Sequence, residues 1–188
     1  MSSRKCVRKL YEDGVGTKED DHHIIGGSRP DADVEALAYE IGRRVALKGH
    51  TLKNGGNAGV MAASSRGCVE HGGTAIGCVV EGSDTPGLNQ RNGYSTETKV
   101  FTKYHDRVAE LMDTDRIVVL PGQVGTLGEL FHAWVEAIVY SAVPILLIGK
   151  RNKQLLDFLV ENGFVDQAEH LPYVQYVESI DEIEFLKQ

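Results

Sequence analysis

The sequence predicts an α/β fold with a doubly wound, mostly parallel sheet and helices on both faces. Short apolar runs that are typical of buried strands alternate with helical hydrophobic spacing through most of the chain. Glycine-rich turns follow three of these strands, at residues 26–28, 55–59 and 121–126. Ligands of such sheets bind at the carboxyl ends of the strands, near the point where the strand order reverses. We therefore expect the three turns to line one pocket.

The first half of the chain predicts three strands that alternate with two helices. A strand ending at Ile25 enters the first glycine turn, and Asp31 or Asp33 then caps a helix with apolar residues at helical spacing. A short strand at 51–52 leads into the second turn and a helix that extends to about residue 71. A strand rich in β-branched and small residues follows at 74–80.

The second half begins with residues 81–96, which are predicted as the one long loop; such loops in compact domains are often functional. Apolar spacing from Val100 to Met112 predicts a helix, and the run 117–120 predicts the strand before the third glycine turn. The remaining predicted elements are a long helix over 126–142, a strand at 144–148, a helix around 155–159, a last strand at 173–177 and a short final helix.

Composition limits the class of protein. With 188 residues, we expect an N-terminal arm at 1–21 and a single domain at 22–188. The net charge of −7 argues against non-specific binding to nucleic acid or to an anionic membrane, and no segment has the length and apolarity of a membrane span or signal-peptide core. Cys6, Cys68 and Cys78 lack metal-type spacing, which favours reduced thiols and a cytoplasmic protein.

The stretch Pro121–Glu129, with the sequence PGQVGTLGE, is the most informative in the chain. A strand, a glycine-rich turn and a helix start form a ready site for phosphate, because the first backbone N–H groups of a helix lack internal partners. Thr126 to Glu129 also fits a capping box, in which the two side chains satisfy those same N–H groups. Gly128 costs helix stability, which favours close approach by a ligand. The local pattern leaves both interpretations open.

The other candidate motifs are weaker when each is taken alone. The turn Asn54–Gly59 is similar to a dinucleotide-binding fingerprint without matching it, and no ATP-binding P-loop sequence is present. Arg107 flanks the apolar stripe of its predicted helix, where an arginine forms a surface ion pair or reaches over the strand ends into the pocket. His22, His23 and His132 have no spacing that predicts a metal site.

Together these segments resemble the LONELY GUY family of cytokinin-activating phosphoribohydrolases, which includes members labelled possible lysine decarboxylases. The family motif P-G-G-x-G-T-x-x-E corresponds to residues 121–129, and M-H-x-R-K corresponds to 104–108. The family turn G-G-G-x-x-G-[LI]-M is similar to residues 55–61, and its first-strand G-S turn to residues 27–28. The resemblance covers about residues 22–186, in the same order and with similar spacing.

This resemblance implies a Rossmann-like fold, usually dimeric, and hydrolysis of the N-glycosidic bond of a nucleoside 5′-monophosphate to free base and ribose 5-phosphate. It makes Arg107 and Glu129 the catalytic pair and requires neither a metal nor a redox cofactor. The positions that it assigns to phosphate or nucleotide binding are Gly27, Ser28, Gly55, Gly56, Asn57, Gly59, Met61, Gly122, Gln123, Val124, Gly125 and Thr126.

Three residues depart from the family pattern. Gln123 replaces the second glycine of P-G-G, Val108 replaces a lysine, and Asn57 replaces the third glycine of its turn. The retained Arg107 and Glu129 favour an enzyme acting on a nucleoside monophosphate. The departures favour the alternative, a non-catalytic carrier or sensor of a nucleotide or of a phosphate-bearing cofactor on the same scaffold.

Overall fold

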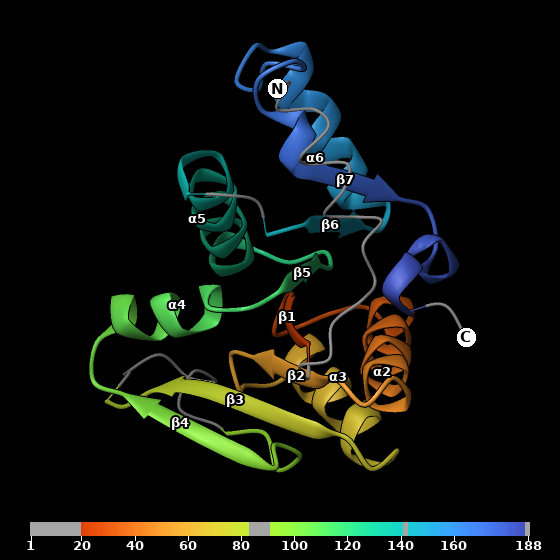
Figure 1. The fold of residues 1–188 in the computed structure, drawn as a ribbon, viewed down its shortest axis with the longest axis vertical. Coiled ribbons are helices and arrows are strands. Elements are labelled where there is room, and N and C mark those ends of the chain that lie inside the picture. Colours follow the sequence, from red (N-terminus) through yellow and green to blue (C-terminus); the bar gives the residue numbers. More distant parts are fainter. Residues whose placement is uncertain (1–19, 83–90, 141–142, 187–188) are drawn as a thin grey trace.

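A computed structural model describes residues 20–82, 91–140 and 143–186. Within these ranges the chain forms one seven-stranded sheet with the order β4-β3-β2-β1-β5-β6-β7, and every neighbouring pair of strands is parallel (Figure 1). The predicted α/β class and Rossmann-like architecture are confirmed. The predicted arm lies outside the described residues except for Asp20 and Asp21, and so does half of the predicted loop 81–96, at residues 83–90.

The strands and helices alternate along the chain. The strands are β1 (Asp21–Ile25), β2 (Thr51–Asn54), β3 (Thr74–Val80), β4 (Glu97–Phe101), β5 (Arg116–Val119), β6 (Ile145–Ile148) and β7 (Val174–Val177). The helices are α2 (Ala32–Leu47), α3 (Val60–Val69), α4 (Tyr104–Met112), α5 (Val124–Tyr140) and α6 (Lys150–Glu161), and short 3₁₀ helices span Leu171–Tyr173, Ile180–Glu182 and Glu184–Leu186.

Two hydrophobic clusters cover the two faces of the sheet. One cluster packs α2, α3 and the C-terminal 3₁₀ helices against one face, and the other packs α4, α5 and α6 against the opposite face (Figure 1). Because successive side chains of a strand point to opposite faces, Ile24 belongs to the first cluster and Ile25 to the second. By the same alternation, His22 shares the face of Ile24 and His23 shares the face of Ile25, so the two histidines lie on opposite faces of β1.

Two elements differ from the prediction. Val100 lies in β4, an edge strand, and α4 begins only at Tyr104. Val100 continues the helical spacing of α4 by coincidence, and the half-exposed β4 has no apolar run that would mark it as a strand. The predicted final helix is a pair of 3₁₀ helices, whereas the predicted cap at Asp31 is confirmed, since its carboxylate accepts from the N–H of Val34 at 2.9 Å.

None of the helices in the described ranges combines the length and the apolarity that a membrane crossing requires.

Candidate active site

The three glycine turns contact one another at the carboxyl ends of β1, β2 and β5. The N–H of Gly27 donates to the carbonyl of Pro121 at 3.3 Å, and the N–H of Val60 donates to the carbonyl of Gly27 at 3.0 Å. The chain runs from β1 outward to β4 and then returns to the other side of β1 as β5, so this is the topological switch point of the sheet. The convergence expected from the fold is confirmed.

Close approach of backbone segments explains two of the glycines. A Cβ atom on Gly122 would collide with the hydroxyl of Thr126 and would lie 2.8 Å from the backbone nitrogen of Gly27. A Cβ atom on Gly55 would collide with a guanidinium nitrogen of Arg107. These glycines let the turns after β5 and β2 pack directly against their neighbours.

Asn54 organises the second turn, a role that the sequence motif does not indicate. Its side-chain oxygen accepts from the N–H of Gly56 at 2.8 Å, and its amide nitrogen donates to the carbonyl of Met61 and to the hydroxyls of Ser64 and Ser65. This fully buried asparagine therefore ties the end of β2 to the first turn of α3. Its position immediately before two glycines is the only signal in the sequence.

The helix after the third turn begins earlier than the capping-box interpretation requires. Helix α5 starts at Val124, and its first intrahelical bond runs from the N–H of Leu127 to the carbonyl of Gln123 at 3.0 Å. Thr126 thus lies inside the first turn and not at the cap, so the capping-box interpretation is wrong. The N–H groups at residues 124–126 have no carbonyl one turn earlier within the helix, as an anion site at a helix start requires.

Arg107 and Glu129 form an ion pair close to these turns. Nη1 of Arg107 lies 2.9 Å from Oε1 of Glu129, and the two side chains are only 8% and 12% exposed. Arg107 is held in place because its Nε donates to the carbonyl of Cys78 at 2.7 Å. The pair is buried, which rules out the interpretation of Arg107 as a surface arginine. Burial raises the pKa of Glu129, and the neighbouring Arg107 opposes that rise.

His23 lies beside this pair and was not predicted as a site residue. Its Nε2 is 3.9 Å from Oε2 of Glu129, and its side chain is fully buried in β1. Within the described part of the chain, neither ring nitrogen has a hydrogen-bond partner. Burial, with Arg107 and Lys53 nearby, lowers the pKa of His23 to about 3, so the imidazole is neutral at physiological pH. The available signal was a histidine directly before the apolar pair Ile24–Ile25 of a central strand.

The remaining predicted binding positions differ in accessibility. Gly27, Gly55, Gly56, Asn57, Met61 and Thr126 are buried, Gly59 and Gly122 are half-buried, and Ser28, Gln123, Val124 and Gly125 are exposed. The backbone carbonyl of Asn57 accepts from the side chain of Asn92 at 3.2 Å, so Asn92 supports the second turn from the segment before β4.

Two of the departures from the family pattern are explained by their surroundings. Val108 packs in the hydrophobic cluster beneath α4, so a valine at this position belongs to the core and not to the Arg107–Glu129 pair. Gln123 is exposed at the start of α5, whereas the crowded position of the P-G-G motif is Gly122, which is retained. Neither departure disrupts the geometry of the ion pair.

A second group of polar side chains lies on the opposite face of β1. Asp20, His22 and His50 bring potential ligand atoms within 4.8 Å of one another, a grouping that the spacing along the sequence did not reveal. The imidazoles are joined by an Nε2···Nδ1 hydrogen bond of 2.7 Å, and Arg116 lies 3.7 Å from Asp20. These contacts link His22 to His50 and Asp20 to Arg116 on this face.

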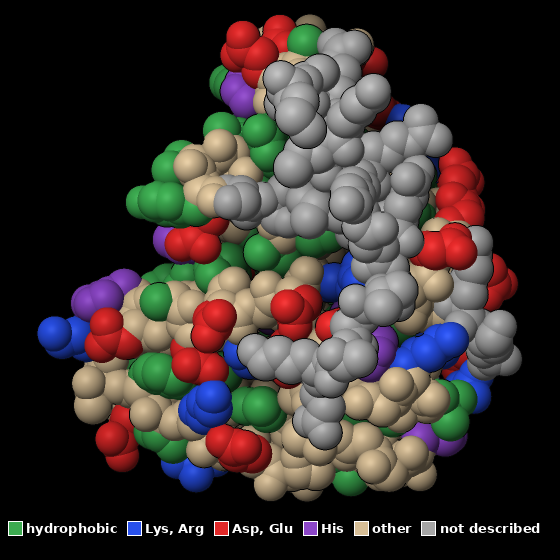
Figure 2. Space-filling model, viewed as in Figure 1, with side chains coloured by type: hydrophobic (Ala, Val, Ile, Leu, Met, Phe, Trp, Pro, Cys, Tyr) green, Lys and Arg blue, Asp and Glu red, His purple; other side chains and the backbone are tan. Residues whose placement is uncertain are grey.

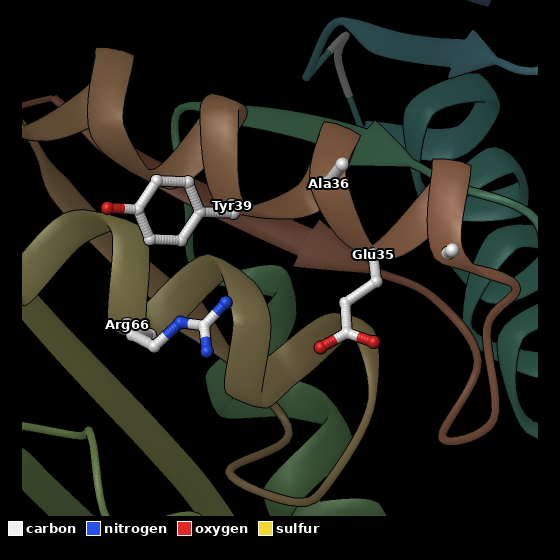
Figure 3. Close-up of a pocket in the computed structure, with 5 residues that line it drawn as sticks. Glu35, Ala36, Tyr39 and Arg66 are labelled. Carbon is white, nitrogen blue, oxygen red and sulfur yellow. The ribbon is translucent and has the colours of Figure 1, made fainter.

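A groove of about 360 Å³ lies between α2 and α3, apart from the predicted site residues. The side chains of Glu35 and Tyr39 from α2 and of Arg66 from α3 line it (Figure 3). The guanidinium of Arg66 lies 5.2 Å from the ring centroid of Tyr39, and the Tyr39 hydroxyl donates to Glu70 at 2.6 Å. These contacts join the two helices, so the groove is a packing feature of this face.

The fold and the site together define a Rossmann-like α/β protein with a buried arginine–glutamate pair beside a helix start at its switch point. Residues 23–175 match the model of the SLOG cluster4 family, and the chain belongs to that family. The resemblance to the LONELY GUY family is likewise confirmed. The cytokinin riboside 5′-monophosphate phosphoribohydrolase of Mycobacterium tuberculosis is 34% identical over 145 residues, which cover 71% of this chain and 75% of that protein.

Solved structures of similar fold include two proteins connected with the molybdenum cofactor. The molybdenum cofactor binding protein of Rippkaea orientalis superimposes with a TM-score of 0.65 at 22% identity, covering 87% of this chain and 92% of that one. The molybdenum cofactor carrier protein of Chlamydomonas reinhardtii gives a TM-score of 0.64 at 20% identity, covering 86% and 91%. At these identities the likeness concerns the fold alone.

Proposed function

We propose that this protein hydrolyses the N-glycosidic bond of a nucleoside 5′-monophosphate, releasing the free base and ribose 5-phosphate. The observation that carries the proposal is the buried Arg107–Glu129 pair, placed at the switch point of the sheet beside the open first turn of α5. Relatives in the family support it, because the Mycobacterium tuberculosis protein is named for this reaction on a cytokinin riboside 5′-monophosphate.

The first turn of α5 is suited to the 5′-phosphate. The backbone N–H groups at residues 124–126 and the positive end of the helix dipole favour an anion there. Gln123, Val124 and Gly125 are exposed, so a phosphate reaches these groups from solvent. The local site is thus compatible with a chain whose net charge is −7.

Glu129 is suited to the bond-breaking step. As the bond between C1′ and the base breaks, positive charge develops on the ribose, as in glycoside hydrolysis. The carboxylate stabilises that charge and accepts a proton from the attacking water, whose oxygen bonds to C1′. The base leaves with the electron pair of the broken bond and takes up a proton from solvent. Arg107 favours the ionised form of the carboxylate against the effect of burial, which raises the pKa of Glu129, and keeps one of its oxygens fixed.

The second candidate function is a non-catalytic carrier of a phosphate-bearing cofactor. The folds of the molybdenum cofactor proteins and the exposed Gln123 at the mouth of the phosphate site favour it. A glutamine side chain at this position offers hydrogen bonds to a larger ligand than a nucleotide phosphate. This candidate predicts ligand-induced thermal stabilisation without release of base.

We also propose that the protein forms a homodimer through α5. Hydrophobic side chains gather over this helix (Figure 2), and Val135, Val139 and Tyr140 are 58%, 58% and 77% exposed. An apolar helix face of this kind pairs readily with its own copy across a two-fold axis.

The test of the proposed reaction is release of base from a panel of purine and pyrimidine 5′-monophosphates. We expect turnover by the wild-type protein and a loss of about 10²–10⁴-fold in kcat for Glu129→Gln, as removal of a general base produces. Glu136→Gln is the matched control, because Glu136 lies on the same helix with its side chain 41% exposed and forms an ion pair with His132, away from Arg107.

The two candidate functions give different results in this experiment. If a nucleotide raises the melting temperature while no base is released by the wild-type protein, the carrier is supported and the enzyme is rejected. If Glu129→Gln retains full activity, the assignment of Glu129 as the catalytic carboxylate is wrong.

A further inference from the structure

We propose that His23 is the positioning residue of Glu129, donating an Nε2–H hydrogen bond to Oε2 and fixing the carboxylate in the orientation in which it acts. The inference rests on the proposed function for its catalytic consequence. It concerns a residue outside the motifs through which the chain resembles its family, since His23 precedes the G-S turn in the middle of β1.

The position of His23 follows from the alternation along β1. His23 shares a face with Ile25, which packs in the cluster formed with α4 and α5, the two helices that supply Arg107 and Glu129. In the sheet it is paired with Lys53 of β2 and Ile117 of β5, so it lies in the centre of the sheet directly beneath the ion pair.

The two oxygens of Glu129 are divided between two neighbours. Oε1 accepts from Arg107 at 2.9 Å, and Oε2 lies 3.9 Å from Nε2 of His23. A movement of about 1 Å brings the second pair to hydrogen-bond distance. With donors on both oxygens, the plane of the carboxylate would be fixed from two sides, as a base that must face a bound ribose requires.

The energetic cost of His23 supports a function. A buried polar group without a partner destabilises the folded protein, and a valine or isoleucine would fill a central parallel strand without that cost. Both nitrogens of this fully buried ring lack partners within the described residues. Oε2 of Glu129 is the polar atom within reach that would satisfy one of them.

Burial is the main reason why His23 is neutral, and the positively charged groups that face it act in the same direction. Arg107 from α4 and Lys53 from β2 oppose a proton on the ring, and Glu129 from α5 is the only anion among the three. The imidazole is therefore a neutral donor that does not take the proton from Glu129. A donor to the ionised carboxylate lowers the pKa of Glu129 and so retains the anion that a positively charged transition state requires.

The kinetic test compares His23→Leu with His23→Gln, whose amide nitrogen lies near the place of Nε2. For His23→Leu we expect kcat to fall about tenfold with KM within about twofold, and the acid limb of the pH profile to shift upward by about half a unit or more, because one hydrogen bond to the anion is lost. His23→Gln should restore both. His22→Gln, on the opposite face, is the control.

A spectroscopic test is independent of turnover. Long-range ¹H–¹⁵N spectra of the histidine-labelled protein at pH 7 should show His23 as a neutral ring with its proton on Nε2, and Glu129→Gln should move the Nε2 resonance. An Nδ1–H tautomer, or an Nε2 resonance unmoved by Glu129→Gln, would overturn the proposal. A protein without turnover that passes this test would overturn the proposed reaction and leave the His23–Glu129 contact established.

Discussion

The adjacent histidines on the two faces of β1 have different surroundings. His22 is fully buried, but its Nε2 is hydrogen-bonded to His50 at 2.7 Å and its ring stacks on Phe185 with a centroid distance of 4.8 Å. His23 is equally buried and has neither contact, and its Nε2 lies 3.9 Å from Oε2 of Glu129. Burial of a histidine is thus no sign of function by itself. The sign is a ring with neither nitrogen hydrogen-bonded to a described residue, beside a buried carboxylate at the switch point of the sheet.

The largest effect that we expect from this comparison is a loss of stability in acid. Folding lowers the pKa of both histidines, to about 3 for His23, so the unfolded chain binds their protons more tightly than the folded one. The stability that depends on the neutral histidines is therefore fully present above about pH 6.5. It is lost as the pH falls from 6.5 towards 3. From pH 7 to pH 4, His23 alone accounts for about 3 kcal/mol of the free energy of unfolding.

Urea unfolding at a series of pH values measures this loss. His23→Leu should flatten the dependence between pH 6.5 and 4, since the substituted chain has no proton to bind at this position. Glu129, whose pKa is raised in the folded state, acts in the opposite direction and does not explain a loss in acid. A pH profile of His23→Leu that parallels the wild-type profile would show that His23 is not a buried neutral ring.

The second prediction compares the same substitution at the two positions at pH 7. His22→Leu removes the hydrogen bond between His22 and His50 and leaves His50 without this partner. We therefore expect a loss of about 1–3 kcal/mol in the free energy of unfolding. His23→Leu removes a ring whose Nδ1 has no partner within the described residues and whose Nε2 lies 3.9 Å from Oε2 of Glu129, so we expect a smaller loss, below about 1 kcal/mol. Chemical denaturation of both variants measures the difference, and equal losses would remove the distinction between the two faces.

Much of the fold follows from the sequence because most strands are buried on both faces. Apolar runs such as 117–120 and 144–148 identify strands, and glycines identify the turns that follow them. The edge strand β4 was missed because its side chains are largely half-exposed and leave no continuous apolar run. The start of α5 was displaced by two residues because Thr126 and Glu129 imitate a capping pair.

The candidate site was only partly predictable. Arg107 and Glu129 were found by their place in two motifs, and the rule for parallel sheets correctly brought the glycine turns together. His23 and Asn54 were missed because their roles depend on contacts with residues 7–106 positions away, which no local pattern encodes. That Val108 belongs to the core could not be predicted either, because only the packing of α4 shows it.

The smallest predicted effect again distinguishes the two faces, through a glycine in a helix on each. In α2, on the His22 face, a Cβ atom on Gly42 would collide with the backbone of Ser64, so Gly42→Ala should lose stability. In α5, on the His23 face, a Cβ atom on Gly128 would have no atom of the described residues within 4 Å. Gly128→Ala should therefore gain up to about 1 kcal/mol in the free energy of unfolding, the helix propensity of alanine over glycine.

The open space at Gly128 is part of the ligand site only if the gain in stability of Gly128→Ala is accompanied by a loss of ligand affinity. A nucleotide bound at the first turn of α5 would approach the bare helix surface formed by Gly125 and Gly128. We expect Gly128→Ala to weaken the nucleotide-induced rise in melting temperature while the apoprotein becomes more stable. An unchanged ligand response would show that the ligand does not extend over this part of the helix and would restrict the phosphate to residues 124–126.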